Sequence, residues 1–223
     1  YDDLFGFAVT QIFIQGSRTY ALAKGGIYYS DVIENGFDPY ESQGYCSAHK
    51  LLTHSSGWYT GSDCGFSISD DSGYTWTDYS NGLENLRVWN IARTNLYYYA
   101  MVYSVDDGLF RSKTYLNEWE RVPNDLGMMY LSDIDILDNI IFAVGNGMLY
   151  RSDDFGNTFE TILGAGSGSY LYIKNNKVFF FSNTEIKYST DVGITWQTWI
   201  SGITGAIELY CMAISESEDT SFV

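Results

Sequence analysis

Short, mostly apolar stretches that end in serine recur along the chain. Each has the character of a strand and is followed by a more polar segment. Their final serines are Ser30, Ser69, Ser112, Ser152 and Ser189. Successive serines are 39, 43, 40 and 37 residues apart. A period in this range indicates a repeat protein in which each unit is one small supersecondary structure.

A second marker follows the same period. An aromatic residue opens a strand-like segment in each unit, at Phe5, Tyr45, Trp89, Tyr130, Tyr170 and Tyr210. These positions are 40, 44, 41, 40 and 40 residues apart. Because two independent markers share one spacing, the sequence predicts five complete repeats and the first part of a sixth.

Each repeat contains four strand-like segments separated by turn-forming residues. In the first repeat the predicted strands are 5–14, 19–24, 26–31 and a weakly marked fourth after Gly36. In the third repeat they are 86–92, 96–103, 108–112 and 118–122. Helical periodicity is absent from the sequence, and four short strands per repeat are typical of a propeller blade.

The predicted fold class is therefore all-β. It is a β-propeller of four-stranded antiparallel blades, with five complete repeats plus a partial sixth, forming a single domain over residues 1–223. Residues 210–223 supply only the start of a sixth unit. We therefore expect the chain to be part of a larger propeller of roughly six to eight blades or of a multidomain protein.

Three of the serines begin a longer motif: Ser, any residue, Asp, any, Gly, any, Thr, aromatic. Its members are Ser69, Asp71, Gly73, Thr75 and Trp76; Ser152, Asp154, Gly156, Thr158 and Phe159; and Ser189, Asp191, Gly193, Thr195 and Trp196. In this pattern Asp accepts hydrogen bonds from nearby amides, Gly takes a positive φ, and the ring packs into the core beside the turn. The motif predicts a hairpin turn with a structural role. Ser112 and Trp119 keep the separation of seven residues without the middle of the motif.

The motif resembles the Asp-box, or BNR repeat, of the sialidase-like and sortilin-like β-propellers. This resemblance implies a propeller in which the motif forms the hairpin between the third and fourth strands of a blade, on the face away from most active sites. It does not imply one activity. The family includes sialidases, xyloglucan-cleaving glycosidases, sortilin-type receptors, photosystem II assembly factors and secreted bacterial surface proteins.

The net charge of the chain makes two classes of binding partner unexpected. The chain carries 12 Lys plus Arg against 28 Asp plus Glu, a net charge of −16. Nucleic acids and anionic membrane surfaces need cationic stripes, so neither is an expected partner. No apolar run approaches the roughly 20 residues of a membrane-spanning helix, so direct membrane insertion is not expected. Hydrophobic content of 45% and aromatic content of 17% favour a folded β protein.

An enzyme is the alternative class, a glycoside hydrolase with carboxylates at the channel mouth. A sialidase needs three arginines around its substrate carboxylate. Here Arg111 and Arg151 precede equivalent serines, which indicates a structural role in the repeat. The adjacent carboxylates of Asp70 and Asp71, and of Asp153 and Asp154, lie on turns where neighbouring side chains point apart. A xyloglucanase-like enzyme would need two carboxylates across a cleft.

Asp133, Asp135 and Asp138 are the candidates for an acidic or Ca²⁺ site. Asp133 and Asp135 share one face of a predicted inner strand by alternation, and carboxylate oxygens suit Ca²⁺. The competing interpretation, which we favour, is the solvated end of an inner strand in an acidic protein.

His49 and His54 lie near Cys64, but their spacing fits no zinc pattern, so neither a metal nor a cofactor is predicted. Cys46 and Cys64 fall in one repeat and could form a disulfide, which would leave Cys211 odd. The acidity, the residue usage and the resemblance favour a secreted or cell-surface protein.

The leading hypothesis is a non-catalytic Asp-box propeller that serves as a rigid scaffold for binding a protein or glycan. An assembly factor for a membrane complex is a further alternative. Candidate contact residues are the aromatics between the first and second strands, together with Trp58, Tyr59 and Tyr97 to Tyr99. For most of these tyrosines blade packing is the interpretation that we favour. The ligand and the oligomeric state remain open at this stage.

Overall fold

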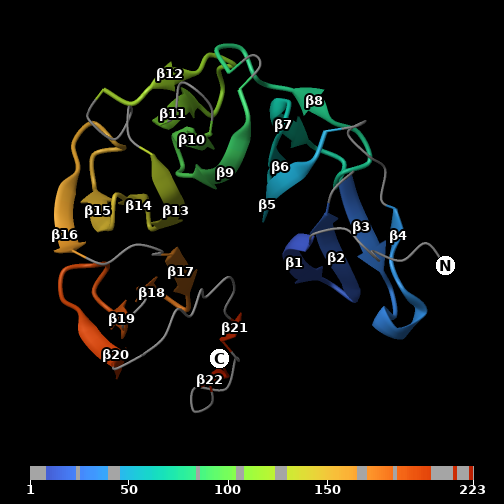
Figure 1. Ribbon diagram of the computed structural model, residues 1–223. Coiled ribbons are helices and arrows are strands. Elements are labelled where there is room, and N and C mark those ends of the chain that lie inside the picture. The colour runs from blue at the N-terminus through green and yellow to red at the C-terminus, as the bar shows by residue number, and fades with distance from the viewer. Residues whose placement is uncertain are drawn as a thin grey trace. The chain divides into compact units, whose positions relative to one another are not determined.

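The computed structural model describes residues 9–23, 26–39, 46–83, 86–103, 108–123, 130–164, 170–182, 185–201, 213–214 and 221–222. Within these residues nearly all regular structure is β-strand, with one short 3-10 helix, η1 (Ile33–Asn35). The strands form five four-stranded antiparallel sheets, in each of which strands that follow one another in the chain are neighbours (Figure 1). This confirms the predicted all-β fold with five propeller blades.

Contacts within the chain divide it into two compact units, of which the first comprises residues 1–92 and 96–121. It contains blades 1 to 3. Blade 1 consists of β1 (Val9–Gln15), β2 (Arg18–Ala23), β3 (Gly26–Ser30) and β4 (Asp38–Pro39). Blade 2 consists of β5 (Ala48–His54), β6 (Gly57–Ser62), β7 (Gly65–Ser69) and β8 (Thr77–Asp78). Blade 3 consists of β9 (Val88–Arg93), β10 (Tyr97–Val102), β11 (Gly108–Lys113) and β12 (Glu120–Arg121).

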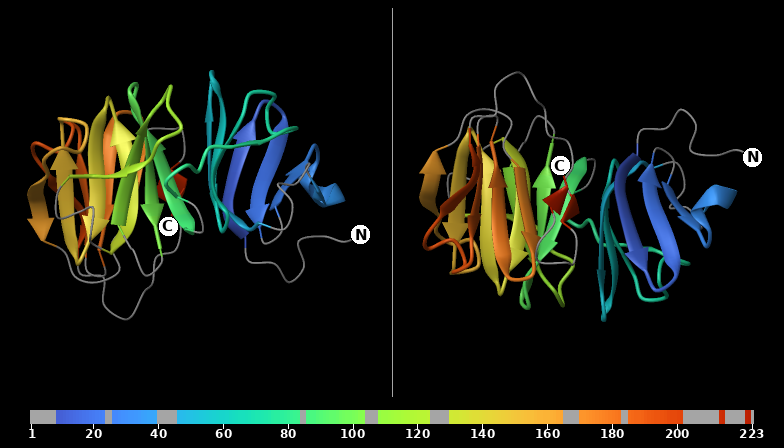
Figure 2. Two further views of the ribbon diagram at one scale, coloured as in Figure 1. Left: turned by 90° about the horizontal axis from the view of Figure 1, so that it is seen from above. Right: turned by 90° about the horizontal axis from the view of Figure 1, so that it is seen from below.

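The second unit comprises residues 93–95 and 122–223 and contains blades 4 and 5. Blade 4 consists of β13 (Leu131–Leu137), β14 (Ile140–Gly145), β15 (Met148–Ser152) and β16 (Glu160–Gly164). Blade 5 consists of β17 (Tyr170–Lys174), β18 (Lys177–Phe181), β19 (Glu185–Ser189) and β20 (Gln197–Ser201). The strands of these two blades lie roughly along one axis, and neighbouring strands point in opposite directions (Figure 2). Two further strands, β21 (Ala213–Ile214) and β22 (Ser221–Phe222), pair antiparallel where the sequence predicts the sixth repeat.

The second strand of each blade is the most buried. In β2, β6, β10 and β14 every residue after the first is buried. Their sequences are runs of aromatic, apolar and small residues, such as Ile141-Phe142-Ala143-Val144 in β14. Such a run suits a strand that is covered on both faces. The second strand of a blade, which lies between the first and the third, is therefore shielded from solvent.

Among the described residues, three hydrophobic clusters lie between consecutive blades of a unit, and a fourth lies within blade 5. In unit 1, Tyr20 and Leu22 of blade 1 pack with Leu51 and Trp58 of blade 2. Blades 2 and 3 share a second cluster that includes Phe66, Val88, Ile91, Tyr98 and Trp119. In unit 2, blades 4 and 5 meet through Phe142, Val144, Leu149, Val178 and Phe180. Each blade therefore completes the core of its neighbour, as expected for a stacked repeat.

Predicted strand limits agree with the structure to within about two residues wherever both can be compared. The third repeat, predicted at 86–92 and 96–103, begins with β9 and β10, and the weak fourth strand of the first repeat is the two-residue β4. The markers Phe5, Tyr45 and Tyr210, and the odd cysteine Cys211, lie outside the described residues.

Candidate functional site

The three copies of the motif form three nearly identical turns. They connect β7 to β8, β15 to β16 and β19 to β20, which is the hairpin position that the resemblance implies. In the first turn the Ser69 hydroxyl donates to Asp71 Oδ1 at 2.8 Å and accepts from the Gly73 amide at 2.7 Å. The Thr75 amide and hydroxyl donate to the two oxygens of Asp71 at 2.8 and 2.7 Å. The same four bonds recur around Asp154 and Asp191 at 2.6 to 2.9 Å.

The backbone of each turn explains the need for glycine. Two successive residues have positive φ in every copy, ending at Gly73, Gly156 and Gly193 with φ of 92°, 83° and 82°. A β-carbon at Gly193 would also lie 2.6 Å from Cε1 of Phe142 in the preceding blade. The glycine thus serves both the conformation of the turn and its close approach to the neighbouring blade.

Hydrogen bonding within the turns stabilises the ionised carboxylates. The Thr75 amide and hydroxyl, with the Ser69 hydroxyl, lower the pKa of Asp71 to about 2. The Thr195 hydroxyl and amide, with Ser189, lower the pKa of Asp191 to about 2. Burial opposes the effect at Asp154, but the bonds from Thr158 and Ser152 outweigh it and the pKa is again lowered. Such carboxylates are poor proton donors near neutral pH.

The aromatic rings of the motif are less buried than the sequence predicts. Trp76, Phe159 and Trp196 are partly exposed. The indoles of Trp76 and Trp196 donate to the carbonyl oxygens of Gly73 and Gly193 in their own turns, at 2.9 and 3.0 Å. Both rings still pack against the core between two blades.

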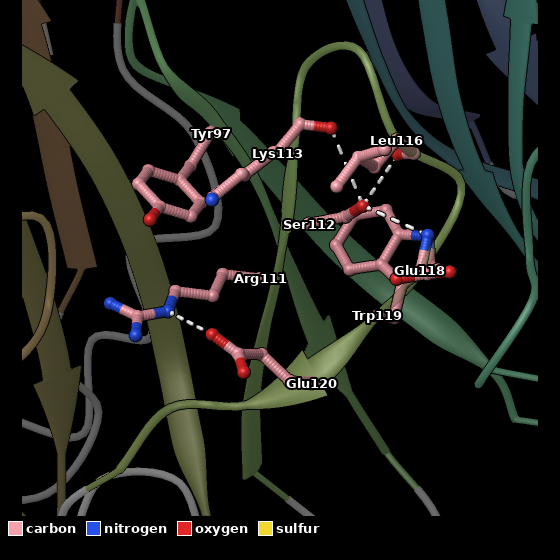
Figure 3. A pocket seen from close by; sticks show the side chains of 8 residues that line it. All are labelled: Tyr97, Arg111, Ser112, Lys113, Leu116, Glu118, Trp119 and Glu120. Atoms are coloured by element: carbon pink, nitrogen blue, oxygen red, sulfur yellow. Dashed lines mark hydrogen bonds and ion pairs between the residues drawn. The ribbon is translucent and has the colours of Figure 1, made fainter.

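Blade 3 lacks the middle of the motif, and a hollow of about 460 Å³ opens there (Figure 3). Ser112 donates to the Leu116 carbonyl at 2.7 Å and accepts from the Glu118 amide at 3.3 Å. On the other side of the hollow, Arg111 Nε donates to Glu120 Oε1 at 2.9 Å and lies over the Tyr97 ring. Its counterpart in blade 4, Arg151, donates to the Val192 carbonyl of the next turn. Several of the polar groups that line the hollow are therefore bonded within blade 3.

Four of the described arginines form ion pairs with separate carboxylate partners. Arg111 and Arg151 form equivalent cross-strand pairs with Glu120 and Glu160, each at 2.9 Å. Their position before the serine thus has the structural role that the repeat suggests. Arg18 pairs with Asp31, and Arg87 with Asp63. These four guanidinium groups each bind a nearby carboxylate, and Arg121 lies over the Phe110 ring.

The three candidate acidic residues of blade 4 have different surroundings. Asp133 accepts hydrogen bonds from the amides of Ile134 and Leu171 at 2.9 and 2.8 Å, and so joins β13 to β17. Asp135 accepts from the Ile136 amide. Burial raises the pKa of Tyr172, and the charge of Asp135 adds to this effect. Asp138 lies in the β13–β14 turn with φ of 51°. A side-chain link between inner strands also occurs in unit 1, where Gln11 bonds both backbone groups of Leu51.

The cysteine and histidine candidates have structural partners. Cys46 and Cys64 form a disulfide, so the Cys64 thiolate is not available as a metal ligand. His49 Nε2 lies 2.8 Å from Asp63 Oδ1, and His54 Nδ1 lies 2.9 Å from the Ser56 hydroxyl. Among the described residues, no group of three His, Cys, Asp or Glu side chains is arranged to hold a metal ion. Likewise, no helix of the described segments is long and apolar enough to cross a membrane.

Most of the candidate aromatic contacts have the alternative role of blade packing. Trp58, Tyr59, Tyr98 and Tyr99 are buried, because the second strand of a blade is covered on both faces. Exposed aromatic rings lie at or next to the N-terminal ends of the inner strands β9, β13 and β17. Trp89, Tyr130 and Tyr170 are three of the aromatic markers that reveal the repeat, and all three are exposed. The recurrence of these markers was the available signal, but the sequence does not tell exposed rings from buried ones.

Comparison with known proteins supports the fold and no particular activity. No protein-family model matches the sequence, and no curated protein matches it. Among solved structures, YCF48 bound to a D1 peptide aligns with a TM-score of 0.62 at 15% identity, over 87% of this chain and 68% of that one. PorZ, a surface component of the type-IX secretion system of Porphyromonas gingivalis, aligns with 0.60 at 13%, over 86% and 33%. The GH74 xyloglucanase of Xanthomonas campestris aligns with 0.59 at 14%, over 79% and 35%.

The fold is a β-propeller. At these identities the likeness concerns the fold alone, and the chain spans about two thirds of one of these structures and about a third of the other two.

Proposed function

We propose that the chain is a non-catalytic propeller of the Asp-box type, belonging to a secreted or cell-surface protein, and that it acts as a rigid scaffold for binding a protein or glycan. The observation that carries the proposal is the internal use of the motif's polar groups. In all three turns the Asp, Ser and Thr side chains bond to one another and to the turn backbone. Groups held in this way stabilise a turn and leave ligand contacts to other surfaces.

Two further observations support the location and the mode of action. The Cys46–Cys64 disulfide suits an oxidising compartment such as the cell exterior. Similar folds occur in a bacterial surface component and in a propeller bound to a peptide. These proteins make a surface location and a binding role reasonable for the present chain.

A glycoside hydrolase is the second candidate, because a xyloglucanase is among the similar structures. The two classes separate in one experiment. The 223-residue chain is incubated with a fluorogenic sialoside and with xyloglucan, and product release is compared with that of a heat-denatured sample. We expect no release above this background. Turnover that is lost on heating would overturn the non-catalytic proposal.

A further inference from the structure

An exposed tryptophan at the opening of β9 lies in a prearranged group of polar side chains. Trp89 keeps 46% of its surface exposed, and Tyr103 beside it keeps 50%. The Trp89 ring centre lies 4.6 Å from that of His49 and 6.4 Å from that of Tyr103. We call Trp89, His49, Tyr103, Asp63 and Arg87 the Trp89 platform. All five belong to unit 1.

The strand geometry places this ring apart from its neighbours. Val88 and Asn90, on either side of Trp89, are buried, so alternation along β9 directs Trp89 to the other face. On that face Ile91 is covered, whereas Trp89, near the start of the strand, is exposed. Val88 packs so closely on blade 2 that a β-carbon at Gly61 would lie 2.6 Å from its Cγ1. The packing of Val88 on blade 2 thus fixes the position of β9, and the Trp89 indole projects from this fixed strand.

The polar edge of the platform is organised by one carboxylate. Asp63 Oδ1 lies 2.8 Å from His49 Nε2 and 2.7 Å from Arg87 Nε. Asp63 is itself fixed, because its amide donates to the Ser47 carbonyl at 3.1 Å and the next residue, Cys64, is bonded to Cys46. The disulfide therefore holds the turn that orients the imidazole and the guanidinium. Such preorganisation lowers the entropy lost on binding.

We propose that the Trp89 platform binds a neutral glycan; this rests on the proposed binding function and names the ligand class for it. A sugar ring has an apolar face of C–H groups, which fits a flat indole, and hydroxyls at its edge, which fit fixed polar groups. Asp63, His49 and Arg87 supply both acceptors and donors beside the ring. A polyanionic glycan is disfavoured by the net charge of −16.

The test is electrophoresis of the 223-residue chain in native gels that contain a soluble polysaccharide. The neutral probes are xyloglucan, galactomannan, laminarin, dextran and hydroxyethyl cellulose, and polygalacturonate is the anionic comparison. We expect at least one neutral probe to retard the chain. The retardation should weaken about tenfold or more in Trp89→Ala and be partly retained in Trp89→Phe.

Tyr74→Ala is the matched control. Tyr74 is an equally exposed ring, but it lies in the turn that follows β7, whereas Asp63 lies in the turn that precedes it. Asp63→Asn should also weaken binding, because it removes the charge that orients His49 and Arg87. Circular dichroism of each variant checks that the fold is retained.

The outcomes separate the two proposals. Equal retardation of Trp89→Ala and the parent chain, or no retardation by any neutral probe, overturns the glycan inference. If a displayed peptide library instead selects ligands whose binding requires Trp89, the binding scaffold stands and the ligand class is wrong. If a retarding polysaccharide gains reducing ends during incubation, the non-catalytic function is wrong.

Discussion

The turn of blade 5 and the turn of blade 3 keep the same two anchors and hold them differently. Both have a buried serine and a tryptophan seven residues later, Ser189 with Trp196 and Ser112 with Trp119. In blade 5 the serine bonds to Asp191 and to the Gly193 amide, and the indole donates to the carbonyl of Gly193. Every one of these bonds is made inside the turn.

In blade 3 the turn depends on its surroundings. The Trp119 indole donates to the Tyr79 carbonyl at 2.6 Å, and the Trp119 amide donates to the Asn81 carbonyl at 2.9 Å. Both acceptors lie in the connection from blade 2 to blade 3. Trp119 is also only 7% exposed, whereas Trp196 is partly exposed. The comparison teaches that the spacing of the serine and the aromatic residue marks the strand ends. Asp, Gly and Thr allow the turn to satisfy its hydrogen bonds without groups from outside it.

The largest expected effect is the loss of the buried indole. Trp119→Ala should lower the free energy of unfolding by about 4 kcal/mol, because it removes a buried ring and leaves the Tyr79 carbonyl without its donor. Trp196→Ala should cost about 2 kcal/mol, because part of that ring is already in water. Urea denaturation followed by far-ultraviolet circular dichroism measures both without relying on tryptophan fluorescence.

The conservative variant sharpens this comparison. Trp119→Phe keeps most of the ring but cannot donate to Tyr79, so it should recover much of the loss and still fall about 1 kcal/mol short. Equal losses in Trp119→Ala and Trp196→Ala would show that the two turns depend on their rings alike, and would contradict the distinction.

Glycine substitution tests the close approach between blades. Gly193→Ala should destabilise by about 2 to 3 kcal/mol, because the residue has φ of 82° and its β-carbon would meet Phe142. Gly16→Ala is the matched control, with φ of 64° and nothing within 4 Å of the added carbon. It should cost about 1 kcal/mol, from the backbone alone. The difference between their urea midpoints measures the destabilisation that comes from the contact with Phe142 of blade 4. Equal losses would mean that Phe142 moves aside at little cost.

The fold was largely predictable because its signals are local and repeated. A period of about 40 residues, turn formers and alternation locate the strands, and the motif places a carboxylate where Thr75 and Ser69 can reach it. Exposure was less predictable, since it depends on the neighbouring blade. Trp58 and Trp89 look alike in sequence, yet one is buried in a second strand and the other is exposed at an inner strand.

The same limit applies to side-chain partners. The bond from Trp119 to Tyr79 joins residues 40 positions apart, and that from Leu171 to Asp133 joins residues 38 apart. Neither pairing has a local signal, because each depends on how one blade stacks on another. The alternation that places Asp133 beside Asp135 could not show that Asp133 is engaged by the next strand.

The smallest expected effect concerns acid. In the turns that contain the motif Asp, an ionised carboxylate accepts the stabilising hydrogen bonds. These turns, unlike the blade 3 turn, should therefore make the stability of the protein sensitive to acid. The pKa of Asp71 is about 2 in the fold against 3.8 ordinarily, so the unfolded chain binds the proton first as the pH falls. The stabilisation is therefore complete above about pH 4 and is lost as the pH falls toward 2.

Substituting Asp71 and its neighbour Asp70 separately shows whether the acid sensitivity comes from the Asp71 hydrogen bonds. Asp71→Asn should flatten the fall of the urea midpoint between pH 4 and 2, because an amide does not bind a proton in this range and the lowered pKa of Asp71 is the source of the fall. Asp70→Asn removes the same charge from the same turn but none of the bonds around Asp71, so its pH profile should run parallel to that of the parent chain. Parallel profiles for all three proteins would mean that these carboxylate bonds form equally well in the unfolded chain, and that the intact turns differ from blade 3 in shape alone.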